Sequence, residues 1–189
     1  MIRYDLAKYI EADSKNFPGA RGGGFTKYKG YLFANPICDQ RYIWAYIYNL
    51  RHVEYWTLKC KEKRTLYNLS MRLFYLYRLR KMSYMTGFQI PPFTCGKGLT
   101  IWHWGSIIIN QNVRIGENCT LYPGVLIGWK NPNEKGCAKI GNNVFIGSGT
   151  KIIGQVKIGN NVIIGQNMVI TKDIPDNSKV VVQSNLRYL

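Results

Sequence analysis

The sequence "IGNNVFIGSGTKIIGQVKIGNNVIIGQNMVI", residues 140–170, repeats one pattern every six residues. A large aliphatic residue opens each unit, Gly usually follows it, and the fifth position is small or β-branched in most units. Such a period fits neither a continuous helix nor a free strand, which need apolar residues about every 3.6 and about every second position. It indicates a short strand followed by a sharp turn, repeated many times.

The repeat extends upstream to residue 109, and every opening position holds Ile or Leu: Ile109, Ile115, Leu121, Ile127, Ile140, Ile146, Ile152, Ile158, Ile164 and Ile170. Three such faces make a coil of about 18 residues, and successive coils stack at about 4.8 Å, the spacing of paired strands. The aliphatic residues then point inward and bury a shared column. Gly and Asn between them supply the positive φ that corners require.

The frame of six breaks in two places. Ile101 lies eight residues before Ile109, so two extra residues bulge out around "HWGS", residues 103–106. The second break, residues 128–139, is rich in Gly, Asn, Pro and Lys and predicts an exposed loop. Residues at such frame breaks are not needed for the packing of a solenoid, so they are free to serve a function.

The first part of the chain differs. In residues 37–87 apolar residues recur at intervals of three and four, which predicts about two helices. Residues 17–30 read as a Gly-rich loop, and the prolines of "IPPF", residues 90–93, end the helical part. We therefore expect a small helical region over residues 1–90, a mainly β solenoid over 91–175 and a tail over 176–189.

The composition limits the function classes. The formal charge of +16 indicates either an excess of solvated lysines or a polyanionic partner such as nucleic acid, anionic lipid or a phosphorylated small molecule. No nucleic-acid recognition motif, P-loop, dinucleotide fingerprint or metal-spaced His/Cys cluster is recognisable, so we expect no nucleic acid and no metal. There is no membrane-spanning run, and residues 1–16 do not read as a signal peptide. The five cysteines fit no disulfide framework, which favours the reducing cytoplasm.

The chain has two histidines. His52 falls in a predicted helix, where a surface or interface position is expected. His103 falls in the frame break between Trp102 and Trp104, and there it is either a packed structural residue or a general base for a hydroxyl proton. The two indole rings could line a pocket and stack on a sugar or an acyl carrier.

The stretches "GKGLTIWHWGSIIINQNVRIGENCTLYPGVLIG", residues 96–128, and "KIGNNVFIGSGTKIIGQVKIGNNVIIGQNMVI", residues 139–170, resemble the hexapeptide-repeat acyltransferases. Within that family they are similar to the serine acetyltransferase branch, and most of all to its short bacterial members encoded with capsule and surface-polysaccharide genes. The likeness covers about residues 87–175 and is weak in the helices before them. It implies a left-handed parallel β-helix.

The resemblance also implies an acetyl-CoA-dependent O-acetyltransferase that works as a homotrimer, with its sites between neighbouring subunits. His103 matches the catalytic histidine, and Gln89 stands where the family has its aspartate partner. The donor would lie against Gly147, Ser148, Gly149 and Lys151, with Lys139 and Lys172 as candidates for its phosphates, unless these lysines are merely solvated charges. From the residues themselves, we predict that Trp102, Trp104 and Asp13 contact the acceptor.

Two departures bear on the acceptor. Serine acetyltransferases have an aspartate before the catalytic histidine, where this chain has Trp102, and an Arg-His pair where it has Gly136 and Cys137. A sugar hydroxyl, in surface polysaccharide synthesis, is therefore the expected acceptor, with serine or another small hydroxy compound as the alternative. A third possibility is a trimeric scaffold without activity. Residues 72–84, "RLFYLYRLRKMSY", further predict a peripheral contact with the inner face of a membrane.

Overall fold

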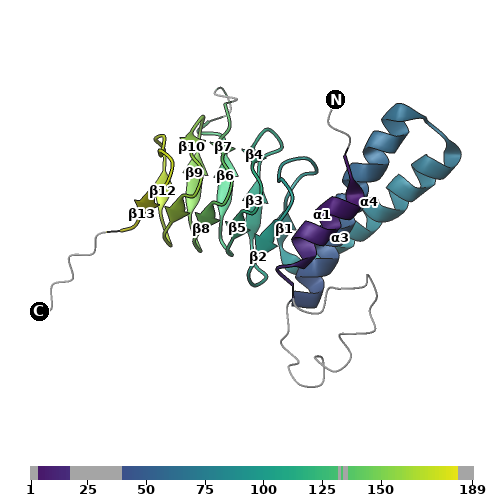
Figure 1. Ribbon diagram of the computed structural model, residues 1–189, viewed down its shortest axis with the longest axis horizontal. Coiled ribbons are helices and arrows are strands. Elements are labelled where there is room, and N and C mark those ends of the chain that lie inside the picture. The colour runs from purple at the N-terminus through teal and green to yellow at the C-terminus, as the bar shows by residue number, and fades with distance from the viewer. Residues whose placement is uncertain (1–3, 18–39, 132, 134–135, 183–189) are drawn as a thin grey trace, which may run out of the picture.

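The structure, a computed structural model, describes residues 4–17, 40–131, 133 and 136–182. These residues form helices at one end and a stack of short strands beside them (Figure 1). The helices are α1 (Leu6–Ser14), α3 (Gln40–Glu62) and α4 (Leu66–Thr86). The strands are β1 (Phe88–Gln89), β2 (Thr100–Ile101), β3 (Ile107–Ile109), β4 (Arg114–Ile115), β5 (Thr120–Leu121), β6 (Leu126–Gly128), β7 (Lys139–Ile140), β8 (Phe145–Ile146), β9 (Lys151–Ile153), β10 (Lys157–Ile158), β11 (Ile163–Ile164), β12 (Val169–Ile170) and β13 (Lys179–Val180). The predicted Gly-rich loop lies outside the described residues, except for Phe17.

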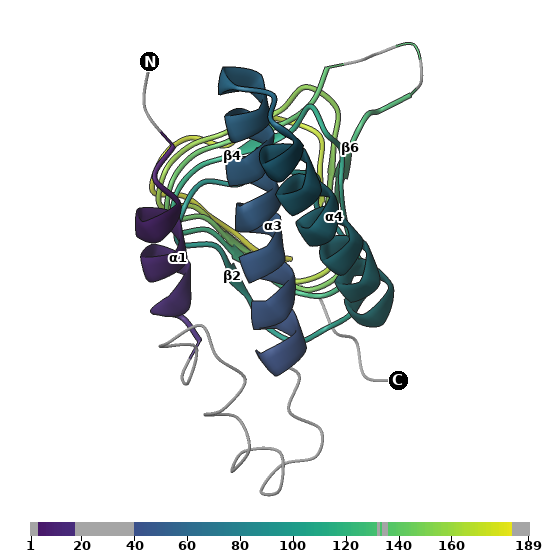
Figure 2. The ribbon, with the colours of Figure 1, turned by 90° about the vertical axis from the view of Figure 1, so that its right-hand side faces the viewer.

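The described strands pair in parallel and form three sheets, which the chain visits in turn. The β1 sheet has the order β1-β3-β6-β9-β12, the β2 sheet β13-β11-β8-β5-β2, and the β4 sheet β10-β7-β4. All ten predicted aliphatic positions are buried, each with at most 6% of its surface exposed. The predicted left-handed parallel β-helix is confirmed, and in Figure 2 its coils superpose behind the helices.

In most repeat units the corner lies at the fourth residue. Asn143 and Asn161 both have φ of 55°, and Gly124 occupies the same kind of position with φ of 80°. Asn tolerates the left-handed region better than other residues with a Cβ. It also links coils here, because the Asn143 Nδ2 donates to Oδ1 of Asn161 at 3.0 Å.

The β-helix is longer than the predicted 91–175. It begins at Phe88, which pairs with Ile107, and its last strand ends at Val180, in β13, which pairs with β11. The period of six does not predict the last coil. Ile174, which bridges to Ile158, comes only four residues after Ile170. β6 ends at Gly128 and β7 begins at Lys139, which leaves the segment between them outside the strands.

The two long helices cap the β1 and β2 end of the stack (Figure 1). α4 begins where the Thr65 hydroxyl accepts the N–H of Asn68 at 3.1 Å, and it ends at Gly87 with φ of 77°. A left-handed glycine is a common helix stop, and here it ends the helix before the prolines can. Among the described residues, no helix combines the length and the apolar character needed to cross a membrane.

A buried ionic network joins the helices to the first coil. Arg51 is fully buried, and its Nε donates to Asp13 Oδ2 at 2.7 Å while its Nη1 lies 3.1 Å from Glu54 Oε2. The same guanidinium donates to the carbonyls of Cys95 and Gly96, at 2.8 and 2.6 Å. One arginine thus connects α1, α3 and the start of the β-helix.

Candidate functional site

The bulge that holds His103 lies where the β2 sheet turns into the β1 sheet. Ile101 pairs with Leu121 and Ile109 pairs with Ile127, so the first coil uses eight residues where the next uses six. The two extra residues were predicted from the frame break. His103 stands in this turn with φ of 65°, a conformation that only a few per cent of residues other than Gly adopt.

Three elements support the bulge. The N–H of Gly105 donates to the carbonyl of Thr86 at 3.0 Å, at the end of α4. The ring of Trp104 packs on Tyr42 of α3, with ring centroids 5.9 Å apart. On the other side the N–H of Gly124 donates to Ser106 at 2.6 Å. The surroundings therefore hold His103 in its unusual backbone conformation, which is typical of a residue placed for function.

Both tryptophans keep an accessible face. Trp102 is 37% and Trp104 is 45% exposed, although each is anchored through backbone or ring contacts. Trp102 follows Ile101 as Tyr122 follows Leu121, so the register places Trp102 beside Tyr122 on the next coil. Tyr122 was missed in the sequence analysis, yet counting twenty residues from Trp102 finds it. The edge thus offers aromatic surface next to the imidazole.

The predicted donor residues continue along the same edge. The N–H of Gly149 donates to the carbonyl of Pro123 at 2.9 Å, and the Ser148 hydroxyl donates to that same carbonyl at 2.9 Å. The amine of Lys151 donates to the carbonyl of Gly124. Gly147 to Lys151 therefore lie one coil beyond Gly124, which itself bonds to the His103 bulge. The structure brings this segment and His103 to one edge.

The other two lysines lie elsewhere. Lys139 begins β7 of the β4 sheet, and Lys172 follows β12 just before Ile174, so both lie where the β1 sheet turns into the β4 sheet. Within one chain the width of the β1 sheet separates them from the His103 edge. Their donor-binding role stays a prediction that a neighbouring subunit would have to fulfil.

Gln89 lies on the coil next to the bulge. It pairs with Ile108 in the β1 sheet and its side chain is exposed. Two residues earlier, Gly87 packs so closely on Gly105 that an added Cβ would lie 3.3 Å from the Gly105 carbonyl carbon. Gln89 is thus near the bulge, and its role in orienting His103 stays a prediction.

The prediction that Asp13 contacts the acceptor is wrong. Its carboxylate is fully buried, with one oxygen on the Arg51 Nε and the other accepting the N–H of Leu99 at 2.8 Å. An acceptor sugar cannot reach these oxygens without opening the network described above. Asp13 is therefore a structural residue.

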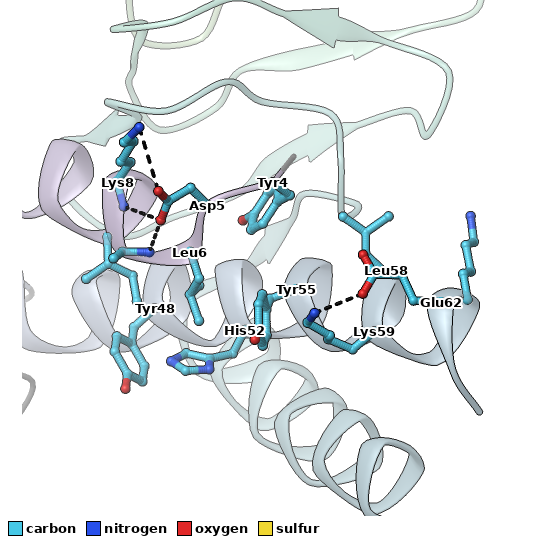
Figure 3. Close-up of a pocket in the computed structure, with 13 residues that line it drawn as sticks. Tyr4, Asp5, Leu6, Lys8, Tyr48, His52, Tyr55, Leu58, Lys59 and Glu62 are labelled. Carbon is cyan, nitrogen blue, oxygen red and sulfur yellow. Dashed lines mark hydrogen bonds and ion pairs between the residues drawn. The ribbon is translucent and has the colours of Figure 1, made fainter. Parts of the chain in front are cut away.

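The helical region has a hollow of its own, away from His103. It is an open groove between the start of α1 and α3, lined by aromatic and apolar side chains and by the ion pairs Lys8–Asp5 and Lys59–Glu62 (Figure 3). His52 lines it and stacks on Tyr75, with ring centroids 4.1 Å apart. Neither ring nitrogen of His52 has a hydrogen-bond partner among the described residues. Burial, and then the charge of Arg78, lower the pKa of His52 to about 4.

This shift predicts a pH-dependent stability. The folded-state pKa of His52 lies below its ordinary value of 6.5, so between those values the unfolded chain binds the proton better. The stabilisation is present above pH 6.5 and is lost as the pH falls towards about 4. We expect the melting temperature of the wild type to fall more steeply over this range than that of His52→Phe, which keeps the stacking. Equal slopes in matched buffers would contradict the expectation.

Cys137 lies just before β7, at the corner between the β1 and β4 sheets and away from His103. Burial raises the pKa of the Cys137 thiol, which disfavours a nucleophilic thiolate. Among residues 4–17, 40–131, 133 and 136–182, no group of three or more His, Cys, Asp or Glu side chains could hold a metal ion.

Residues 137–172 match the model of the bacterial transferase hexapeptide family, described as six repeats. The matched residues run from β7 to β12, the most regular part of the stack, and their repeats are similar to those of this family.

Two relatives match a longer stretch of the chain. The chain is 36% identical over 98 residues to WcaB of Escherichia coli K12, a protein named for acetyl transfer in colanic acid biosynthesis. It is 34% identical over 97 residues to a serine acetyltransferase of Helicobacter pylori. The matches cover 51% and 50% of this chain, and 60% and 54% of the relatives. The chain therefore spans less than two thirds of the length of these relatives.

Solved structures agree in fold. Serine acetyltransferase isoform 3 of Entamoeba histolytica, in complex with cysteine, superposes with a TM-score of 0.67 at 20% identity. The superposition covers 97% of this chain and 60% of that one, so it includes the helical region as well as the hexapeptide-repeat domain.

Proposed function

We propose that this protein is an O-acetyltransferase that transfers the acetyl group of acetyl-CoA to a sugar hydroxyl, with His103 as general base. The observation that carries the proposal is the bulge, which holds His103 between two accessible indoles at the edge shared with Gly147–Lys151. The relatives named as acetyltransferases support the reaction class.

In the proposed reaction the imidazole of His103 takes the proton of the acceptor hydroxyl as its oxygen attacks the thioester carbonyl carbon. The tetrahedral intermediate then collapses, the carbon–sulfur bond breaks, and the imidazolium returns the proton to the CoA thiolate. Gln89 would fix the tautomer of His103 by hydrogen bonding, although it cannot stabilise the imidazolium by charge.

A sugar fits the acceptor side better than serine. Carbohydrate rings present apolar faces, for which the exposed faces of Trp102 and Trp104 are suited. An amino acid would need an anion for its ammonium group, and the position beside the base holds Trp102. Serine remains the second candidate because a serine acetyltransferase is among the relatives.

The proposed active form is a homotrimer with the donor between subunits. Three outward aliphatic side chains support it, since Ile108 and Val169 on the β1 sheet and Ile163 on the β2 sheet are exposed. These two sheets meet at the His103 edge. A neighbouring subunit that covered the three side chains would therefore also enclose the site. The same neighbour could bring Lys139 or Lys172 to the donor phosphates.

The proposed location is the cytoplasm, at the inner face of the membrane. The four described cysteines, Cys60, Cys95, Cys119 and Cys137, are free, which fits a reducing compartment.

The test is CoA release from acetyl-CoA, followed with a thiol reagent across an acceptor panel of serine and several sugars. We expect release that depends on a sugar, and a Trp102→Ala variant whose KM for that sugar rises about tenfold, because stacking on an aromatic ring is lost. CoA release with serine alone would show that serine, and not a sugar, is the acceptor. A chain that binds no acetyl-CoA at all would favour a scaffold.

A further inference from the structure

The outer side of α4 carries an exposed apolar surface. We call it the α4 surface, and its apolar members are Leu66, Tyr67, Leu73, Phe74, Leu76, Tyr77, Tyr84 and Met85. Leu66 is 84%, Tyr77 is 70% and Tyr84 is 79% exposed. Scattered apolar side chains on a surface are ordinary, whereas a contiguous set along one helix marks an interaction surface.

The charges along α4 and the chain after it have one sign. From residue 63 to residue 116 the sequence contains no Asp or Glu and eight Lys and Arg residues. Arg80 and Lys81 are exposed within the α4 surface, and Lys63 and Arg64 are exposed just before the helix. An apolar surface that also carries cationic side chains suits a partner that is both apolar and negatively charged.

We propose that the α4 surface docks on an anionic phospholipid membrane. A helix lying in the headgroup region buries Leu and Tyr side chains, while Arg and Lys reach the lipid phosphates. Tyrosine is enriched at this depth because its ring is apolar and its hydroxyl is polar. The chain would lie on the membrane rather than cross it, in keeping with the lack of a spanning helix among the described residues.

A second copy of the chain is the less favourable occupant. Two α4 surfaces brought face to face would place Arg80 and Lys81 of each chain near the same cations of the other, and neither surface supplies an acidic residue to offset them. A nucleic acid would satisfy the cations but would leave the leucines without an apolar partner. Of these three occupants, the lipid surface satisfies both parts of the pattern.

The experiment is co-sedimentation of the full chain with vesicles of phosphatidylcholine alone and with about 30% phosphatidylglycerol. Binding is expected only to the anionic vesicles, and raised salt should weaken it. Arg80→Glu with Lys81→Glu is expected to lower the partition coefficient about tenfold or more, since each cation near such a surface contributes several-fold. Leu73→Ser with Tyr77→Ser, at exposed positions, should lower it similarly through lost apolar burial.

The matched control is Lys157→Glu with Lys179→Glu, two exposed lysines on the β-helix, which change the net charge by the same amount. This variant should keep most of the binding. Equal losses in both charge variants, no loss in Leu73→Ser with Tyr77→Ser, or a dimer that only the α4 variants disrupt would each overturn the proposal. The proposal does not rest on the acetyl-transfer reaction, and turnover of a soluble acceptor should be unchanged in the α4 variants.

Discussion

Replacing His103 with Ala is expected to lower kcat/KM for acetyl transfer by about two to four orders of magnitude, the usual contribution of a general base. The acceptor hydroxyl is a weak nucleophile while it keeps its proton, and in the proposed reaction the imidazole of His103 takes that proton. The measurement is CoA release from acetyl-CoA with the acceptor that the panel identifies.

Loss of activity in this variant could also come from a disturbed bulge, because Ala is strained at a φ of 65°. His103→Asn separates the two causes, since Asn tolerates the left-handed region but takes up no proton. It should keep the wild-type melting temperature and still lose the activity. His103→Gly, which also suits this φ, should regain part of the rate when imidazole is added.

The chain supplies its own control. His52→Phe removes the other histidine, which lies in the helical groove, and should leave the rate of acetyl transfer unchanged. A His103→Asn variant that retained most of its activity would rule out the general-base role and point to another base.

The β-helix could be predicted because each repeat unit constrains its own residues. An Ile at every sixth position is a local rule, and even the bulge at His103 is visible as a count of eight instead of six. The last coil escaped prediction because the step from Ile170 to Ile174 is shortened to four residues. Counting the faces of the repeat also places Lys139 and Lys172 away from His103. Their predicted role at the donor phosphates was based on charge alone.

The role of Asp13 could not be read from the sequence. Its partner Arg51 is 38 residues away, and no period places a polar residue of one helix against another. An aspartate in an amphipathic helix is usually solvated, so only the packing of α1 on α3 and the first coil shows that it is buried. The sequence analysis predicts Asp13 at the acceptor, whereas its burial beside Arg51 shows that it stabilises the fold.

Arg51→Met should lower the free energy of unfolding by about 3–5 kcal/mol, the usual cost of removing one partner from a buried ion pair. Asp13 and Glu54 would stay buried without their counter-charge, and the carbonyls of Cys95 and Gly96 would lose a donor. Urea denaturation at one protein concentration measures the effect, because assembly alters apparent stability.

An exposed ion pair serves as the control for the expected loss of stability in Arg51→Met. Lys97 lies 3.3 Å from Glu117, with side chains 41% and 48% exposed, so Lys97→Ala should cost less than about 1 kcal/mol. Asp13→Asn should resemble Arg51→Met, with a large loss of stability and an unchanged KM for the acceptor in the protein that remains folded. An Asp13→Asn variant with wild-type stability and a raised KM would return Asp13 to the acceptor site. We expect reduced stability and an unchanged KM instead, because both carboxylate oxygens of Asp13 are buried in hydrogen bonds to Arg51 and Leu99 and cannot contact a substrate.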